Sequence, residues 1–190
     1  MHLTRDEYEQ QHGKGKTVYL VARIISIVGV LSLMPVLNII DHTINGMRLT
    51  WSGVVVGLVI ATLCTVILKK KKPEAYFDKR RTQNLNVSFF VGFMALGASL
   101  GNYINWGLAD KELVCQTYKI DTVSSAESYS EGTGSRVYYV FIVINNKRER
   151  FQVWKNIYDK ISATGSINVY VQHGALGFDY VKTFKVPDAP

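Results

Sequence analysis

The sequence predicts an α+β membrane protein: three transmembrane helices, followed by a small, mostly antiparallel β-sheet or partly open barrel with one short helix. Two observations support this fold class. Three long windows contain no Asp, Glu, Lys, Arg or His, and from about residue 113 onward the apolar residues take up the short spacing of strands. We therefore expect a polar cytoplasmic tail at 1–16, a membrane region at 17–110 and a β module at 111–190.

The charge-free windows cover residues 24–40, 49–68 and 85–108, which are seventeen, twenty and twenty-four residues long. A helix needs about 20 apolar residues to cross the hydrocarbon core, with a range of roughly 17–25. In a soluble helical bundle each helix would carry a polar face, but the second window has only Ser and Thr as polar residues. The windows therefore predict spans at about 17–40, 49–68 and 85–108.

A short basic loop at 69–84 accounts for most of the net charge. Its seven basic and two acidic residues contribute +5 of the formal +7, so the high pI does not indicate a nucleic-acid-binding protein. Basic residues in short loops mark the cytoplasmic side. We expect these residues to lie at anionic lipid headgroups. They are Lys69, Lys70, Lys71, Lys72, Lys79, Arg80 and Arg81.

This charge distribution predicts one orientation. The N-terminus and the basic loop are cytoplasmic, the loop after the first span is outside, and the C-terminal β module is extracytoplasmic. The short loops favour a bacterial inner membrane.

Small residues recur four apart in two of the spans. Gly53 and Gly57 lie in the second span, and Gly97 and Gly101 lie in the third. Residues at this spacing share one helix face and allow another helix to approach closely. The pairs predict either a tight helix hairpin or a homo-oligomer seam, although glycine is also common in membrane helices without such a role.

The C-terminal third shows the pattern of a small sheet. Asn145 and Asn146 have the residue type of a tight hairpin turn, because asparagine tolerates positive φ. A Ser-, Glu- and Gly-rich segment at 124–136 reads as a loop, with the tip of a long hairpin near Gly134. The expected strands are 113–123, 137–144, 148–154, 167–172 and 178–186, with a short helix at 156–161.

Motifs that would carry chemistry are weak. The Gly15-Lys16-Thr17 segment matches only the end of a phosphate-binding loop, and the position of the motif's first glycine is Gln10. His173 and Asp179 could meet across a turn, but no nucleophile or substrate cleft accompanies them. We therefore expect no catalytic residue, cofactor or metal, and we expect the chain not to be an enzyme.

Aromatic and basic residues of the β module share the strand faces that alternation leaves outward. A surface of this composition is typical of a protein or glycan contact site. Alternatively, the short helix and the long hairpin cover this second face of the sheet. The candidate partner surface consists of Tyr139, Arg148, Arg150, Trp154 and Tyr170.

Taken together, these features predict an integral membrane protein without enzymatic activity. Its extracytoplasmic β module would bind a partner protein or envelope component, in an envelope-accessory or immunity-type role, or the chain would form a homo-oligomer. The alternative is a membrane effector whose β module is a cytosolic sensor of a small ligand and controls helix oligomerisation or a pore.

Overall fold

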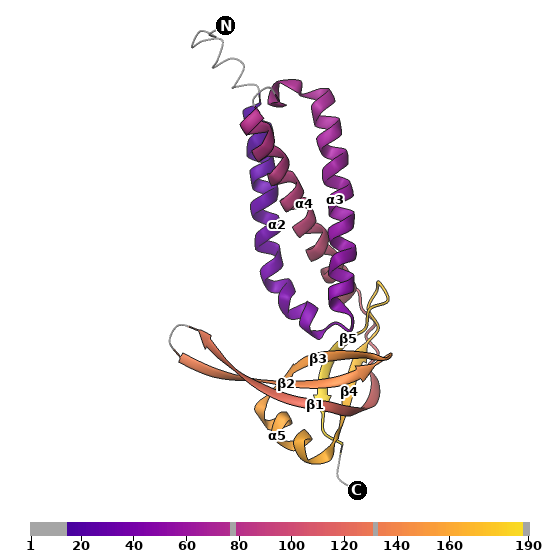
Figure 1. Cartoon of the computed structure of the whole chain (residues 1–190). Helices are drawn as coiled ribbons and strands as arrows, with labels where there is room; N and C mark the ends of the chain where they lie inside the picture. Colours follow the sequence, from indigo (N-terminus) through magenta and orange to yellow (C-terminus); the bar gives the residue numbers. More distant parts are fainter. Residues whose placement is uncertain (1–14, 77–78, 131–132, 188–190) are drawn as a thin grey trace. The chain divides into compact units, whose positions relative to one another are not determined.

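A computed structural model describes residues 15–76, 79–130 and 133–187 (Figure 1), so nearly all of the predicted polar tail lies outside the described residues. The fold class is the predicted one, with three long apolar helices, a five-stranded antiparallel sheet and one short helix. The helices are α2 (Lys16–His42), α3 (Gly46–Lys71), α4 (Lys79–Gly107) and α5 (Lys155–Thr164), with a 3₁₀ turn η1 (Pro73–Tyr76). The strands are β1 (Val114–Ser130), β2 (Thr133–Ile144), β3 (Lys147–Val153), β4 (Ser166–Gln172) and β5 (Tyr180–Lys185).

The chain divides into two compact units. The first unit comprises Met1–Leu37 and Arg48–Asn102, and the second comprises Asn38–Met47 and Tyr103–Pro190. The last turn of α2, the loop between α2 and α3, and the end of α4 therefore belong to the same unit as the sheet.

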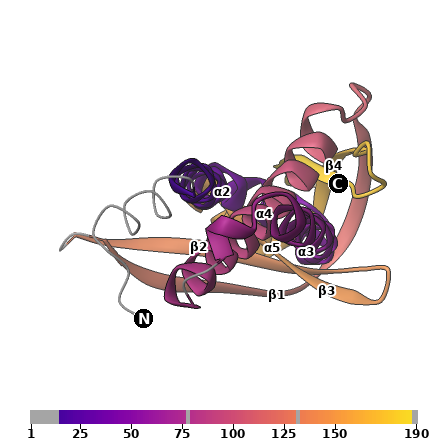
Figure 2. The ribbon, with the colours of Figure 1, turned by 90° about the horizontal axis from the view of Figure 1, so that it is seen from above.

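In the first unit, α4 lies between α2 and α3 (Figures 1 and 2). All three helices are long and apolar enough to cross a membrane, with mean hydropathies of 2.3, 2.3 and 1.5 for α2, α3 and α4. Large apolar side chains are exposed along the outer faces of α2 and α3, for example Leu31 and Leu63. Exposed apolar faces of this length fit a lipid environment, and they indicate a membrane protein.

The lower hydropathy of α4 has a structural cause. Its polar residues Ser99 and Asn102 are buried against the neighbouring helices, where Ser99 Oγ accepts a 2.8 Å hydrogen bond from Ser32 of α2. The side chain of Asn102 donates to Thr50 of α3 at 3.0 Å and to its own helix at Ala98. Polar groups in lipid need internal partners, so the central helix can carry these residues.

The sheet has the strand order β3-β2-β1-β4-β5, with every neighbouring pair antiparallel. The predicted turn between β2 and β3 is confirmed, since Asn145 and Asn146 both have positive φ, at 51° and 61°. The prediction of a loop at 124–136 was wrong. β1 continues to Ser130 and pairs with β2 down to Thr133, so most of this segment forms a two-stranded arm that extends beyond the sheet (Figure 1).

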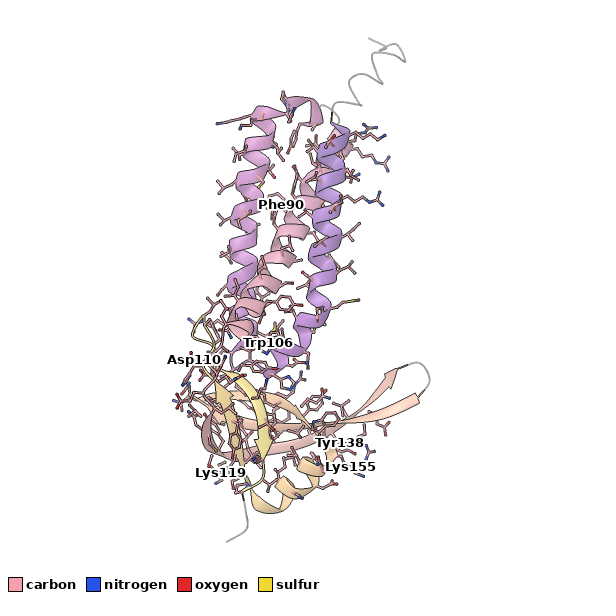
Figure 3. All side chains as sticks on the ribbon, turned by 180° about the vertical axis from the view of Figure 1, so that it is seen from behind. Phe90, Trp106, Asp110, Lys119, Tyr138 and Lys155 are labelled. Atoms are coloured by element: carbon pink, nitrogen blue, oxygen red, sulfur yellow. The ribbon has the colours of Figure 1, made fainter. Side chains whose placement is uncertain are left out.

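One face of the sheet forms the core of the second unit, and we call it the core face. Val140, Ile142 and Phe151 are almost fully buried there, and so are the alternate residues of β4. Helix α5 packs on this face through Ile161, and Tyr138 contacts Tyr158 of α5 at 4.8 Å between ring centroids. Figure 3 shows Tyr138 close to Lys155, the first residue of α5. Residues on the opposite side of the sheet define its outer face.

Candidate functional site

The outer face brings three of the predicted partner residues together. Tyr139 of β2 and both Arg148 and Arg150 of β3 point to this side, because their strand neighbours Val140, Phe151 and Glu149 face the core. The guanidinium of Arg150 lies over the Tyr139 ring at 4.8 Å, and that of Arg148 lies over the Phe141 ring at 4.4 Å. Both distances are in the range of cation–π contacts.

An ion pair fixes one of these arginines. Nε of Arg148 lies 2.8 Å from Oδ2 of Asp121, and its Nη2 donates to the hydroxyl of Thr122. Asp121 is at the irregularity in the pairing of β1 with β2. Such a bulge re-aims side chains, and here the carboxylate reaches a strand that β1 does not pair with. The ion pair thereby positions Arg148 beside β1.

The other two predicted partner residues lie elsewhere. Tyr170 is on the outer face of β4, with Lys185 over its ring at 5.2 Å, but β1 separates it from β2. Trp154 follows the last residue of β3 and precedes α5; it is 81% exposed. The alternation of the strand ends at Val153, so it does not determine where the indole points.

Trp154 borders a pocket of about 350 Å³ within the second unit. Asn38 and His42 of α2 and Gln152 of β3 line the same pocket. Its volume is within the range of small-ligand sites, roughly 300–1,000 Å³. The pocket therefore lies between the last turns of α2 and the edge strand β3.

A second contact between the end of a long helix and the β module involves Asn105, whose role the sequence did not reveal. Asn105 of α4 is fully buried, and its carboxamide contacts the loop between β4 and β5 through Phe178 and Leu176. Gly174 lies so close that any side chain there would clash with Asn105. An asparagine near the end of an apolar span was the available signal, but it did not reveal the partner.

The loop between α2 and α3 is attached to the same region. The backbone N–H of Ile44 donates to the carbonyl oxygen of Asp179 at 2.8 Å, and Thr43 forms an isolated β-bridge with Tyr180. The side chain of Lys147, at the start of β3, donates to Asn45 at 3.1 Å. The loop between α2 and α3 and the end of α4 are therefore both hydrogen-bonded to the β module of the second unit.

His173 and Asp179 do meet across the turn. Nδ1 of His173 lies 2.8 Å from Oδ1 of Asp179. The hydrogen bond and the charge of Asp179 raise the pKa of the His173 imidazole, with smaller contributions from Asp110 and Glu112. Among the described residues no group of three His, Cys, Asp or Glu is arranged to hold a metal ion.

The predicted packing glycines divide into two groups. Added Cβ atoms on Gly53, Gly57 and Gly97 would collide with backbone atoms across the α3–α4 interface, whereas Gly101 has only a side-chain methyl of Leu49 nearby, at 3.9 Å. A further close approach, between Gly29 and Gly92, joins α2 to α4. The first three glycines therefore lie in a helix hairpin within one chain.

The basic residues flank the turn between α3 and α4. Lys69, Lys70 and Lys71 form the last turn of α3, Lys72 follows it, and Lys79 begins α4, with Arg80 and Arg81 in its first turn. The ammonium of Lys69 lies 5.7 Å from the ring centroid of Tyr76 in η1. Helix C-termini favour cations, which stabilises the three lysines of α3 where they are.

Comparison with known protein families, curated proteins and solved structures found no match to this chain.

Proposed function

We propose that the chain is a multi-pass membrane protein without enzymatic activity whose β module binds a partner protein or envelope component through the outer face of its sheet. The observation that carries this proposal is the cluster of Tyr139, Phe141, Arg148 and Arg150 on β2 and β3. Helix α5 packs on the core face, so the short helix does not cover this cluster.

The composition of the cluster supports binding. Aromatic residues and arginine are enriched at interface hot spots, and aromatic rings bury a large area at a small loss of conformational entropy. The cation–π contacts hold both arginines over rings before any partner arrives. Preorganised side chains bind with less entropy loss than mobile ones.

The proposed orientation follows from charge. The seven basic residues at 69–81 belong on the cytoplasmic side, against anionic lipid, which places the N-terminus inside and the β module outside. The short loops favour a bacterial inner membrane as the location.

Photo-crosslinking in intact cells tests the proposal. A photoreactive residue replaces Val143, which is exposed on β2 and pairs with Arg148. We expect one reproducible crosslinked species that disappears in the double variant Tyr139→Ala, Arg150→Ala. The matched control is Lys182→Ala, which removes an exposed cation from β5, a strand separated from β2 by β1 and β4. An adduct that persists unchanged in the double variant contradicts the proposal.

A second candidate function is a small-ligand sensor with a cytosolic β module, and the pocket beside Trp154 favours it. Because Asn38 and His42 belong to the end of α2, a ligand in this pocket would contact both a helix and the sheet. This function requires either the inverted orientation or a chain in which only two of the three candidate helices span the membrane. Labelling that places the C-terminal module in the cytosol would favour the sensor and contradict the first proposal.

A further inference from the structure

An apolar groove of about 420 Å³ runs between α2 and α3 in the first unit, with α4 as its floor. Val18, Val21 and Ile25 of α2 form one wall, while Cys64, Ile67 and Leu68 of α3 form the other. No polar surface contributes to the lining. The volume is in the range of sites that bind small molecules, roughly 300–1,000 Å³.

The floor is built by two aromatic rings. Phe89 and Phe93 of α4 stack with centroids 5.9 Å apart and planes tilted by 12°. The close approach of Gly92 to Gly29 brings α2 against α4 beside these rings. Within the groove Val21 and Ile67 remain about half exposed, at 45% and 51%. Among the residues that the structure describes, the space between the walls is therefore open apolar surface.

The turn between α3 and α4 lies at the end of this groove. Ala75 of η1 is fully buried, and its carbonyl oxygen accepts a hydrogen bond from the hydroxyl of Tyr19 of α2. Leu68 and Phe89, which line the groove, belong to the same apolar cluster as Ala75. η1 thus packs against α2 next to the groove.

Cations border the groove at this same end. Lys69 directly follows Leu68 in α3, with Lys70 and Lys71 completing the last turn, and Lys16 directly precedes the lining residue Thr17 in α2. The contact of Lys69 with Tyr76 keeps one ammonium at the turn. An apolar slot with several ammonium groups at one end matches a molecule that has an acyl chain and a negatively charged head.

We propose that this groove is a binding site for one anionic phospholipid, with an acyl chain between α2 and α3 and the phosphate at the lysines that end α3. The site rests on the proposed membrane embedding of the three helices, and it does not depend on the role of the β module. A zwitterionic lipid would fill the slot equally well but would gain less from the cations. The lining offers no partner to the polar groups of a soluble metabolite.

Lipid retention by the purified full-length protein tests the site. The protein in neutral detergent is incubated with phosphatidylglycerol or phosphatidylcholine, washed by size-exclusion chromatography, and analysed by native mass spectrometry. We expect about one phosphatidylglycerol retained per chain, and at least a fivefold preference for it over phosphatidylcholine. Equal retention of the two lipids, or no retention, overturns the proposal.

Two neighbouring substitutions in α3 separate the groove from the rest of the helix surface. Cys64→Trp fills the groove, whereas Leu63→Trp adds the same side chain at the next position, which is exposed and does not line it. We expect Cys64→Trp to reduce retention of phosphatidylglycerol about tenfold and Leu63→Trp to leave it unchanged. Equal retention in both variants assigns the lipid to the helix surface and refutes the site.

The reactivity of the Cys64 thiol measures occupancy of the groove without changing the volume of a side chain that lines it. In a Cys115→Ser background, N-ethylmaleimide reacts only with Cys64. We expect phosphatidylglycerol to slow this reaction at least fivefold and phosphatidylcholine to slow it less. Replacing Lys69, Lys70 and Lys71 together by Gln is expected to abolish the difference between the lipids. If the difference persists, the lysines do not recognise the headgroup and the proposal is wrong.

Discussion

Nδ2 of Asn105, in the last turns of α4, donates a 2.8 Å hydrogen bond to the carbonyl oxygen of Phe178 in the loop before β5. Oδ1 of the same side chain accepts from the backbone N–H of Leu176 at 3.0 Å, and the side chain is completely buried. One carboxamide therefore satisfies a donor and an acceptor of a loop more than seventy residues away. This connection joins the end of a candidate span to the sheet of the second unit.

Replacing Asn105 by Ala should loosen the loop at 173–178. The substitution leaves the Phe178 carbonyl and the Leu176 N–H without this partner. Both bonds are part-buried, so each orphaned group costs less than the roughly 1–3 kcal/mol of a fully buried one. We expect hydrogen exchange at the Leu176 amide to accelerate at least tenfold. Asn168→Ala is the control, because its carboxamide oxygen accepts only an exposed 2.7 Å bond from Thr117. Equal acceleration in both variants would show that Asn105 does not hold the loop.

Two glycines of α4 that share one helix face should respond oppositely to alanine. A Cβ at Gly97 would collide with the backbone of Gly53, so the α3–α4 interface must open, at a cost of about 1–3 kcal/mol. At Gly101 the nearest atom is a methyl group at 3.9 Å, and alanine gains up to about 1 kcal/mol in helix propensity. Thermal unfolding of the purified protein should therefore show a lower midpoint for Gly97→Ala only. A lower midpoint for Gly101→Ala as well would indicate a packing role that the hairpin does not explain.

The fold was predictable where burial leaves a local pattern. The charge-free windows predicted the three long helices, and the paired asparagines predicted the turn between β2 and β3. The β1–β2 arm was missed for a physical reason. Beyond the sheet it is a two-stranded ribbon whose described side chains, such as Ser125 and Glu127, are solvent-exposed, so no apolar alternation marks its strands.

The sequence predicted only part of the candidate site, namely the residues whose strand register follows from a short turn. A two-residue turn fixes the register of β2 against β3, which places Tyr139, Arg148 and Arg150 on one face once alternation is assumed. Trp154 lies beyond the end of that register. The role of Asn105 depends on a contact between distant segments, and a single sequence carries no local signal for such a contact.

The pKa of His173 should fall when Asp179 is replaced by Asn. Asp179 raises this pKa mainly through its hydrogen bond and then through its charge, so the variant should titrate closer to the unperturbed value of about 6.5. Asp110→Asn should produce a smaller decrease, because Asp110 contributes less. NMR titration of the imidazole measures both. A larger effect from Asp110 would contradict the observed pairing.

The sign of the pH dependence follows from the raised pKa. The contribution of the His173–Asp179 pair is fully present below the unfolded-state pKa of histidine and is lost as the pH rises through the higher folded-state value. The imidazole is exposed, so salt should weaken the effect. Hydrogen exchange in the loop at 174–178 should therefore be slower at pH 5.5 than at pH 8 once intrinsic rates are corrected, and Asp179→Asn should remove the difference.

Cys115 allows the proposed orientation to be tested directly. It is exposed at the start of β1, so burial does not protect it from reagents, and Cys64→Ser removes the other thiol. With the β module outside, a membrane-impermeant maleimide should label Cys115 in intact cells, after the outer membrane is permeabilised if one is present. Inside-out vesicles should remain unlabelled until detergent is added. The reverse pattern would place the basic loop outside, against the charge rule that predicts it to be cytoplasmic, and would favour the cytosolic sensor. A reporter enzyme fused after Pro190 should give the same answer, because both positions lie on the same side of the third candidate span.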